Sequence, residues 1–159
     1  MSYFANQEMV AIHNWSFENF SPASHLNRHY LQSTDIKTWF INDGIKWGVK
    51  LFPNGSSPKD AGFVTLQIDY NGPLKVNARF AFDVFANVNG KEEKVTVETE
   101  SETYTFSPEI QVLQISRFIS HNALVKYGLL IDGYFKMVTK VIYTYDNDLF
   151  GTQTAIGAK

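Results

Sequence analysis

Apolar and polar residues alternate along much of the chain, which is the period-two pattern of β-strands with one buried face. In segment 76–84, Val76, Phe80 and Val84 fall on one side of the expected strand, and Arg79 and Asp83 fall on the other. The same alternation predicts strands over residues 36–41, 45–52, 62–69, 74–87, 92–106 and 134–145. The pattern therefore favours a sheet protein.

Asparagine–glycine and aspartate–glycine pairs punctuate these segments. Such pairs accept the positive φ angles that tight hairpin turns require. Helical signals are sparse, and we expect one short helix in which Ser120 caps residues 121–127 and Gly128 ends the segment. Short strands separated by turns predict an all-β, antiparallel sandwich or barrel in a single domain. The asparagine–glycine and aspartate–glycine pairs that mark these turns are Asp43-Gly44, Asn54-Gly55, Asn71-Gly72, Asn89-Gly90 and Asp132-Gly133.

Composition narrows the class of protein further. The 159 residues include 13 Phe, 8 Tyr and 3 Trp, enough aromatic area for a sheet-rich core. The net charge of −2 argues against a dedicated nucleic-acid-binding protein. The first fifteen residues lack the pattern of a signal peptide, and no apolar run approaches the ~18 residues of a membrane helix. We expect an intracellular protein, in the cytoplasm or nucleus, that does not bind membranes.

The sequence carries no recognisable catalytic or metal-binding motif. Cysteine is absent, which excludes disulfides, cysteine nucleophiles and thiolate zinc sites. His25 and His29 have the i, i+4 spacing of helical metal ligands, but no carboxylate lies between them. Neither a G-x-S-x-G elbow nor a glycine-rich phosphate loop occurs. We expect a protein without cofactor, metal ion or enzymatic activity.

Two groups of charged residues leave alternatives open. Lys50 lies within an apolar strand pattern, so it is either a solvated charge on an exposed sheet face or a contact to a bound partner. Glu98, Glu100 and Glu102 share one face if their segment is a strand. These glutamates form either a solvated strand edge that resists aggregation or an acidic patch for basic partners.

The order of five segments resembles the MATH domain, also called the meprin and TRAF homology or TRAF-like domain. The resemblance covers about residues 8–146 and is nearest to the branch of the speckle-type POZ protein and the nematode MATH–BTB proteins. Residues 1–7 are then an N-terminal tail, and residues 147–159 a C-terminal tail or the start of a linker. The segments are "WSFENFS" (15–21), "IKWGVKLFPNG" (45–55), "GFVTLQI" (62–68), "VNARFAFDVFA" (76–86) and "RFISHNALVKYGLLIDGYFKMVTKV" (117–141).

The resemblance implies an eight-stranded antiparallel β-sandwich that recognises other proteins. In this family branch an extended peptide lies in a shallow groove across one sheet, held by backbone hydrogen bonds and side-chain pockets. This chain departs from the family where relatives carry a K-D-W-G-F-like stretch, because Leu113 and Ile115 replace the two aromatic residues. By resemblance, the peptide-binding positions are Lys50, Gln67, Phe80, Tyr104, Gln111, Leu113 and Ile115.

The pattern and the resemblance predict a module that binds a linear peptide of a partner or substrate protein. In MATH–BTB proteins such a domain serves as substrate adaptor for a cullin-3 ubiquitin ligase. Neither a BTB sequence after residue 146 nor a coiled coil before residue 8 is evident, so a monomer is the default expectation. Alternatives are a sandwich that stacks sugars on Trp39 or Tyr134, and a hydrolase built around His13, His25 or His29.

Overall fold

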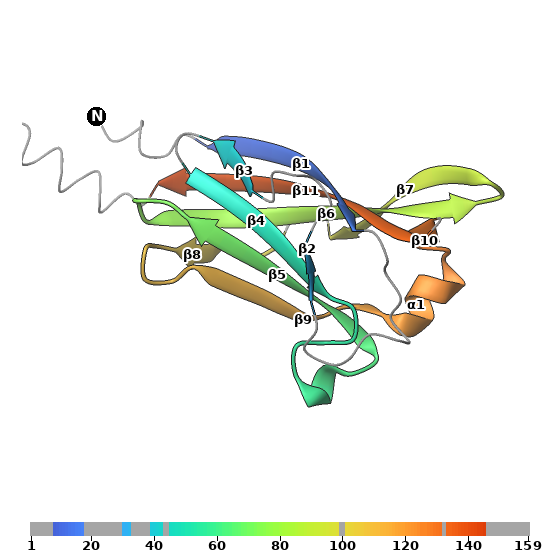
Figure 1. The fold of residues 1–159 in the computed structure, drawn as a ribbon. Helices are drawn as coiled ribbons and strands as arrows, with labels where there is room; N and C mark the ends of the chain where they lie inside the picture. The colour runs from blue at the N-terminus through green and yellow to red at the C-terminus, as the bar shows by residue number, and fades with distance from the viewer. Residues whose placement is uncertain are drawn as a thin grey trace, which may run out of the picture.

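A computed structural model describes residues 8–17, 30–32, 39–42, 45–98, 101–131 and 133–145. These residues form two antiparallel β-sheets and one short helix, arranged as two layers (Figure 1). The first sheet contains β1 (Met9–Phe17), β6 (Val76–Val88), β7 (Lys91–Glu98), β8 (Tyr104–Phe106), β10 (Leu130–Ile131) and β11 (Tyr134–Tyr145). The second contains β2 (Leu31–Gln32), β3 (Trp39–Asn42), β4 (Ile45–Phe52), β5 (Phe63–Asn71) and β9 (Val112–Ser120).

The order of strands confirms the predicted antiparallel sandwich. The main path of the first sheet is β1-β11-β6-β7, and that of the second is β2-β4-β5-β9. The described residues contain eleven strand segments rather than the expected eight. Four of these segments, β2, β3, β8 and β10, have only two to four residues each. The longer strands 9–17 and 112–120 were not among the segments that alternation predicted.

The alternating residues bury their apolar face between the two sheets, as the pattern predicts. In β6, Phe80 and Phe82 are at most 1% exposed, whereas Arg79 on the opposite face is partly exposed. Trp47 of β4 lies at the centre of an aromatic cluster, with its ring centroid 5.0 Å from that of Tyr70 and 5.3 Å from that of Phe106. Residues from both sheets therefore share one core.

The glycine-containing turns differ in structure from one another. Asn89 and Gly90 both have positive φ angles, 52° and 80°, and they close the hairpin between β6 and β7 as expected. Gly55 also has a positive φ of 84°, but it lies near the start of a longer loop over residues 53–62. Gly72 has no positive φ, and instead a side chain there would collide with the Tyr70 hydroxyl. Gly44 lies outside the described residues.

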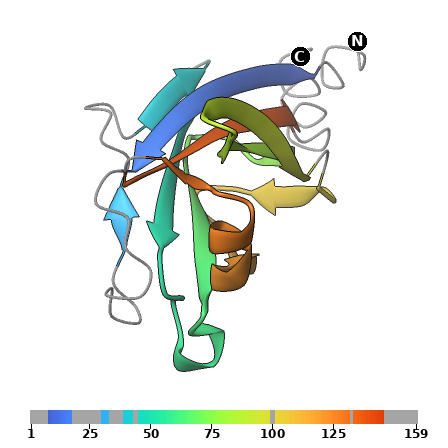
Figure 2. The same cartoon turned by 90° about the vertical axis from the view of Figure 1, so that its right-hand side faces the viewer.

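The predicted helix is present as α1 (His121–Lys126). The Ser120 side chain accepts a hydrogen bond from the Ala123 N–H, which satisfies one of the free donors of the first turn. The segment ends at Gly128, whose φ is 62°. Leu124 buries its side chain in the core, so α1 closes the sandwich at the end of β9 (Figure 2).

Candidate functional site

A chain of polar contacts crosses the outer face of the second sheet. Lys50, Gln67 and Gln114 lie side by side on β4, β5 and β9, because Lys50 pairs with Gln67 and Gln67 pairs with Gln114. Gln114 Nε2 donates to Gln67 Oε1 at 2.8 Å, and Gln67 Nε2 donates to Asp69 Oδ1 at 2.8 Å. Ser56 Oγ donates to Gln114 Oε1 at 3.1 Å. These contacts order the amide side chains.

Lys50 is neither fully solvated nor buried. Its Nζ lies 3.8 Å from Asp69 Oδ2 and 4.9 Å from the centroid of the Tyr30 ring. Its side chain is 27% exposed. Tyr30 in turn contacts Phe52, at 5.6 Å between ring centroids. The charge of Lys50 is thus already balanced by a carboxylate of the same chain, while one side of the residue stays accessible.

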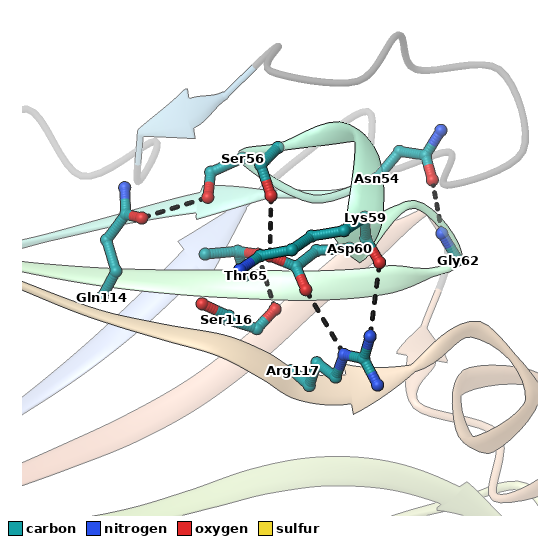
Figure 3. Close-up of polar contacts among 10 residues, drawn as sticks. Asn54, Ser56, Lys59, Asp60, Gly62, Thr65, Gln114, Ser116 and Arg117 are labelled. Carbon is teal, nitrogen blue, oxygen red and sulfur yellow. Dashed lines mark hydrogen bonds and ion pairs between the residues drawn. The ribbon is translucent and has the colours of Figure 1, made fainter.

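The loop over residues 53–62 is fastened to β9 by a second group of polar contacts (Figure 3). Arg117 Nε donates to Asp60 Oδ1, and its Nη2 donates to the Lys59 carbonyl, each at 3.3 Å. Asp60 is 2% exposed and also accepts a hydrogen bond from Ser57 Oγ at 2.9 Å. The Arg117 guanidinium lies 4.9 Å from the Phe63 ring. The Arg117 side chain therefore has partners both in the loop and at the start of β5.

Two further contacts lie at the base of this loop, one within the loop and one between β5 and β9. The Gly62 N–H donates to Asn54 Oδ1 at 2.9 Å and closes the loop on itself. Thr65 is fully buried, and its hydroxyl donates to the Ser116 carbonyl of β9 at 2.7 Å. The loop projects beyond the ends of the sheets in both views, yet its base is tied to β9 (Figures 1 and 2).

A cavity of about 240 Å³ lies on the other side of β9, where the edges of the two sheets face each other. Apolar side chains of both sheets contribute most of its lining. Phe82 and Phe118 meet edge to face at 5.3 Å, and Tyr104 packs 6.3 Å from Phe80. The lining residues are Phe82, Val97, Ser101, Tyr104, Ile115, Arg117 and Phe118.

β9 separates the polar outer face from this cavity and forms an edge of the second sheet. Among the described residues, no strand pairs with the side of β9 that faces away from β5. The Tyr70 N–H donates to the Gln111 carbonyl at 2.8 Å, so the alternation of an antiparallel ladder turns the peptide groups of Val112 and Gln114 away from β5. These groups are oriented toward the open edge.

β9 contains an irregularity that controls which side chains face which way. Val64 pairs with Ile119 and Leu66 pairs with Ile115, so residues 116–118 lie opposite the single residue Thr65. On the regular side of this bulge, Leu113 and Ile115 pack against the core. Gln114 instead lies on the outer face, beside Gln67.

The structure divides the seven residues predicted from the family resemblance among four environments. Lys50 and Gln67 lie on the outer face, and Tyr104 and Ile115 line the cavity. Leu113 packs against the core, and Gln111 is exposed just before β9. Phe80, which the resemblance assigns to peptide binding, is fully buried in the first sheet. The seven residues thus do not share one face.

Several residues of the site have no signal in the sequence. Asp69 and Gln114 join Lys50 and Gln67 only because β4, β5 and β9 are neighbours. Asp60 and Arg117 meet although they lie 57 positions apart in the chain. Val112 had the appearance of an ordinary apolar residue, yet it is 53% exposed beside the open edge. Strand order and the bulge, rather than local pattern, bring these residues together.

The other predicted candidates are placed only in part. His13 lies half-buried in β1 with its ring 4.4 Å from that of Trp15, and His25 and His29 fall outside the described residues. No group of three or more His, Asp or Glu side chains within the described segments is placed to hold a metal ion. The side chain of Trp39 is likewise not described, and Tyr134 is partly exposed. In the same part of the chain no helix is long and apolar enough to cross a membrane.

Comparison with known proteins agrees with this architecture. The family model of the MATH domain matches residues 12–141, which is most of the chain. A search of curated proteins found no match. MATH domains are protein-interaction modules, so the match supports a role in binding another protein. The sandwich of two antiparallel sheets, with its one short helix, belongs to the MATH domain family.

Proposed function

We propose that this MATH domain binds an extended segment of a partner protein by adding it as a further strand to the open edge of β9. The observation that carries the proposal is the position of β9. It has an unpaired edge among the described strands, an apolar cavity on one side and a polar face on the other. Strand addition of this kind combines backbone hydrogen bonds with pockets for alternate side chains.

The two faces of β9 give the bound segment an alternating pattern. Side chains of a strand beside β9 point in turn toward the cavity at Tyr104 and Phe118, and toward the outer face at Gln114. The proposal therefore gives a role to two of the predicted residues, Tyr104 and Ile115, which line the cavity. An apolar side chain fits the cavity, and a polar side chain fits the amide of Gln114, which Gln67 holds in place.

The backbone part of the proposal can be tested separately from the side chains. Val112→Pro removes an N–H that points away from β5, so the β5–β9 ladder keeps its own hydrogen bonds. With the purified chain as bait for a displayed library of short random peptides, we expect Val112→Pro to lose the enrichment that the unaltered chain gives. Val112→Ala, which keeps the N–H, is the matched control and retains it. Equal enrichment by both variants contradicts strand addition at this edge.

The side-chain part is tested by combining Lys50→Glu with Tyr104→Ala. Lys50 lies on the outer face of the second sheet, on β4, and Tyr104 lines the cavity, so the pair alters the outer face and the cavity at once. We expect loss of peptide enrichment with retention of a cooperative thermal unfolding transition. Unchanged enrichment contradicts the assignment of these faces, and binding to a glycan array that survives both changes favours the sugar-binding alternative.

We further propose that the captured protein is a substrate brought to a cullin-3 ubiquitin ligase inside the cell. The support is the resemblance to the MATH–BTB branch. The test is co-purification of cullin-3 with this protein from the native cell, and loss of ubiquitin from the captured partner in the Val112→Pro variant. We propose a monomeric domain, which light scattering of the purified chain checks.

A further inference from the structure

Arg117 is the only charged residue among the described residues that line the cavity beside β9. Its side chain is 58% exposed, whereas the side chain of Asp60, with which it pairs, is 3% exposed. Arg117 also belongs to the bulge at residues 116–118, on the strand whose outer edge is open. A strand added to this edge therefore passes beside an accessible cation.

The guanidinium of Arg117 is ordered by contacts within the chain. Its Nε donates to Asp60 Oδ1 and its Nη2 donates to the Lys59 carbonyl, each at 3.3 Å (Figure 3). The guanidinium carbon lies 4.9 Å from the centroid of the Phe63 ring. Because the side chain is already held in one place, it loses less conformational freedom when a partner binds to it.

Part of this guanidinium remains available to a partner. It carries more N–H donors than its two hydrogen bonds with the loop use. Within the described segments the other donors have no acceptor, and the side chain is more than half exposed. The planar donors of arginine match a carboxylate, which accepts two parallel hydrogen bonds from them.

The charge of the adjoining loop also favours an anion. The carboxylate of Asp60 balances one cation, but Lys59 beside it is exposed and has no ion-pair partner in the part of the chain that the structure describes. Lys59, Asp60 and Arg117 together hold two cations and one carboxylate, so their sum is positive. Complementary charge of this kind guides partner choice and orientation more than it adds affinity.

From this arrangement we infer that the bound segment carries an aspartate or glutamate within two positions of the apolar side chain that enters the cavity. The apolar residue packs against the aromatic rings of the cavity, and the carboxylate accepts hydrogen bonds from Arg117. Side chains two positions apart in an extended strand are about 7 Å apart, so one short segment reaches both. This inference rests on the proposed binding of a peptide beside β9, and it specifies the chemical class of that peptide.

The test uses the purified chain as bait for a displayed library of short random peptides, read by sequencing. We expect the enriched peptides to carry an aspartate or glutamate within two positions of an apolar residue. In a synthetic peptide of an enriched sequence, replacing the acid by its amide is expected to weaken binding about three- to tenfold at low salt. This difference is expected to shrink at high salt, because the contact is exposed and screened.

Two variants test whether the preference for the acid comes from Arg117. Combining Arg117→Gln with Asp60→Asn removes the cation without leaving a buried carboxylate unpaired. In this double variant we expect the acidic peptide and its amide to bind equally well. Asp60→Asn alone keeps the cation and removes its internal partner, so the preference is expected to be kept or increased. A preference that survives the loss of Arg117 contradicts the inference.

Lys46→Gln is the matched control. It removes the same charge from an exposed residue of β4 that does not line the cavity. We expect this variant to prefer the acidic peptide as the unaltered chain does. Equal loss of the preference in Lys46→Gln contradicts the inference, because it shows an effect of net charge alone.

The outcomes separate the inference from the proposed function. Enrichment of apolar-anchored peptides without acidic residues, or with lysine or arginine, overturns the inference and leaves strand addition standing. Enrichment of no peptide by the folded chain overturns both. Circular dichroism of each variant verifies that a loss of binding does not come from a loss of fold.

Discussion

Gln114 Nε2 donates a hydrogen bond to Gln67 Oε1 at 2.8 Å, which joins the carboxamides of β9 and β5 on the outer face of the second sheet. The two residues are 47 positions apart in sequence and are directly opposite each other in the ladder. Each amide also has a second partner, Ser56 or Asp69. The outer face is therefore an ordered polar surface rather than a set of independent side chains.

This contact predicts energetic coupling between the two glutamines. We expect Gln67→Ala and Gln114→Ala each to lower the free energy of unfolding by about 0.5–1 kcal/mol, since both amides are partly exposed. The double variant is expected to lose about 0.5 kcal/mol less than the sum. Urea unfolding of the four proteins measures the cycle, and additive losses show that the bond contributes no coupling.

A second prediction concerns Trp47 at the centre of the aromatic cluster. Its side chain is 1% exposed and contacts rings from both sheets. We expect Trp47→Ala to cost about 3–5 kcal/mol of unfolding free energy, by loss of burial and creation of a cavity. Tyr127→Ala, at a residue that is 55% exposed, is the control and is expected to cost less than about 1 kcal/mol. Similar losses at both positions contradict this description of the core.

A third prediction compares two glycines in the loop over residues 53–62. Gly55 and Gly62 have similar positive φ angles, 84° and 91°. A β-carbon on Gly55 lies 2.6 Å from the Asp60 carbonyl oxygen, whereas one on Gly62 meets nothing within 4 Å. We expect Gly62→Ala to cost about 1 kcal/mol from backbone strain alone. Gly55→Ala is expected to cost at least about 1 kcal/mol more in chemical unfolding, and equal costs contradict the close approach.

A fourth prediction concerns the attachment of this loop through Arg117. Arg117→Ala leaves the buried carboxylate of Asp60 with the Ser57 hydroxyl as its remaining described side-chain partner. We expect a loss of about 1–3 kcal/mol in unfolding free energy, because a buried charge loses a donor. Combining it with Asp60→Asn, which removes the charge, is expected to recover part of that loss. A double variant less stable than the sum of the single changes contradicts this account.

Alternation was enough to predict the faces of β6, because every second side chain from Val76 to Ala86 is buried in the core. The β6–β7 turn followed from Asn89-Gly90, and α1 followed from the Ser120 cap. The site was harder to predict, since it depends on the order of strands in the sheet. Alternation alone also did not predict the bulge at residues 116–118 that disturbs the pattern of β9.

The MATH resemblance supplied the fold family but not the orientation of every residue. Leu113, which the resemblance assigns to peptide binding, pairs with Ile68 and faces the core. Lys50 was open to two interpretations in the sequence. The structure gives it a carboxylate and an aromatic ring as neighbours while leaving it partly accessible, a geometry that only the pairing of β4 with β5 reveals.

The bulge in β9 also offers a route by which related binding specificities can diverge. A strand exchanges its two faces when its register moves by one residue. Because residues 116–118 already depart from regular pairing, a one-residue insertion or deletion there can move the register of residues 112–115 by one, while β4 and β5 keep their positions. Such a change turns Gln114 inward and Ile115 outward. A single insertion or deletion at this point can thus change which side chains the open edge of β9 presents to a partner, while the fold of the sandwich is kept.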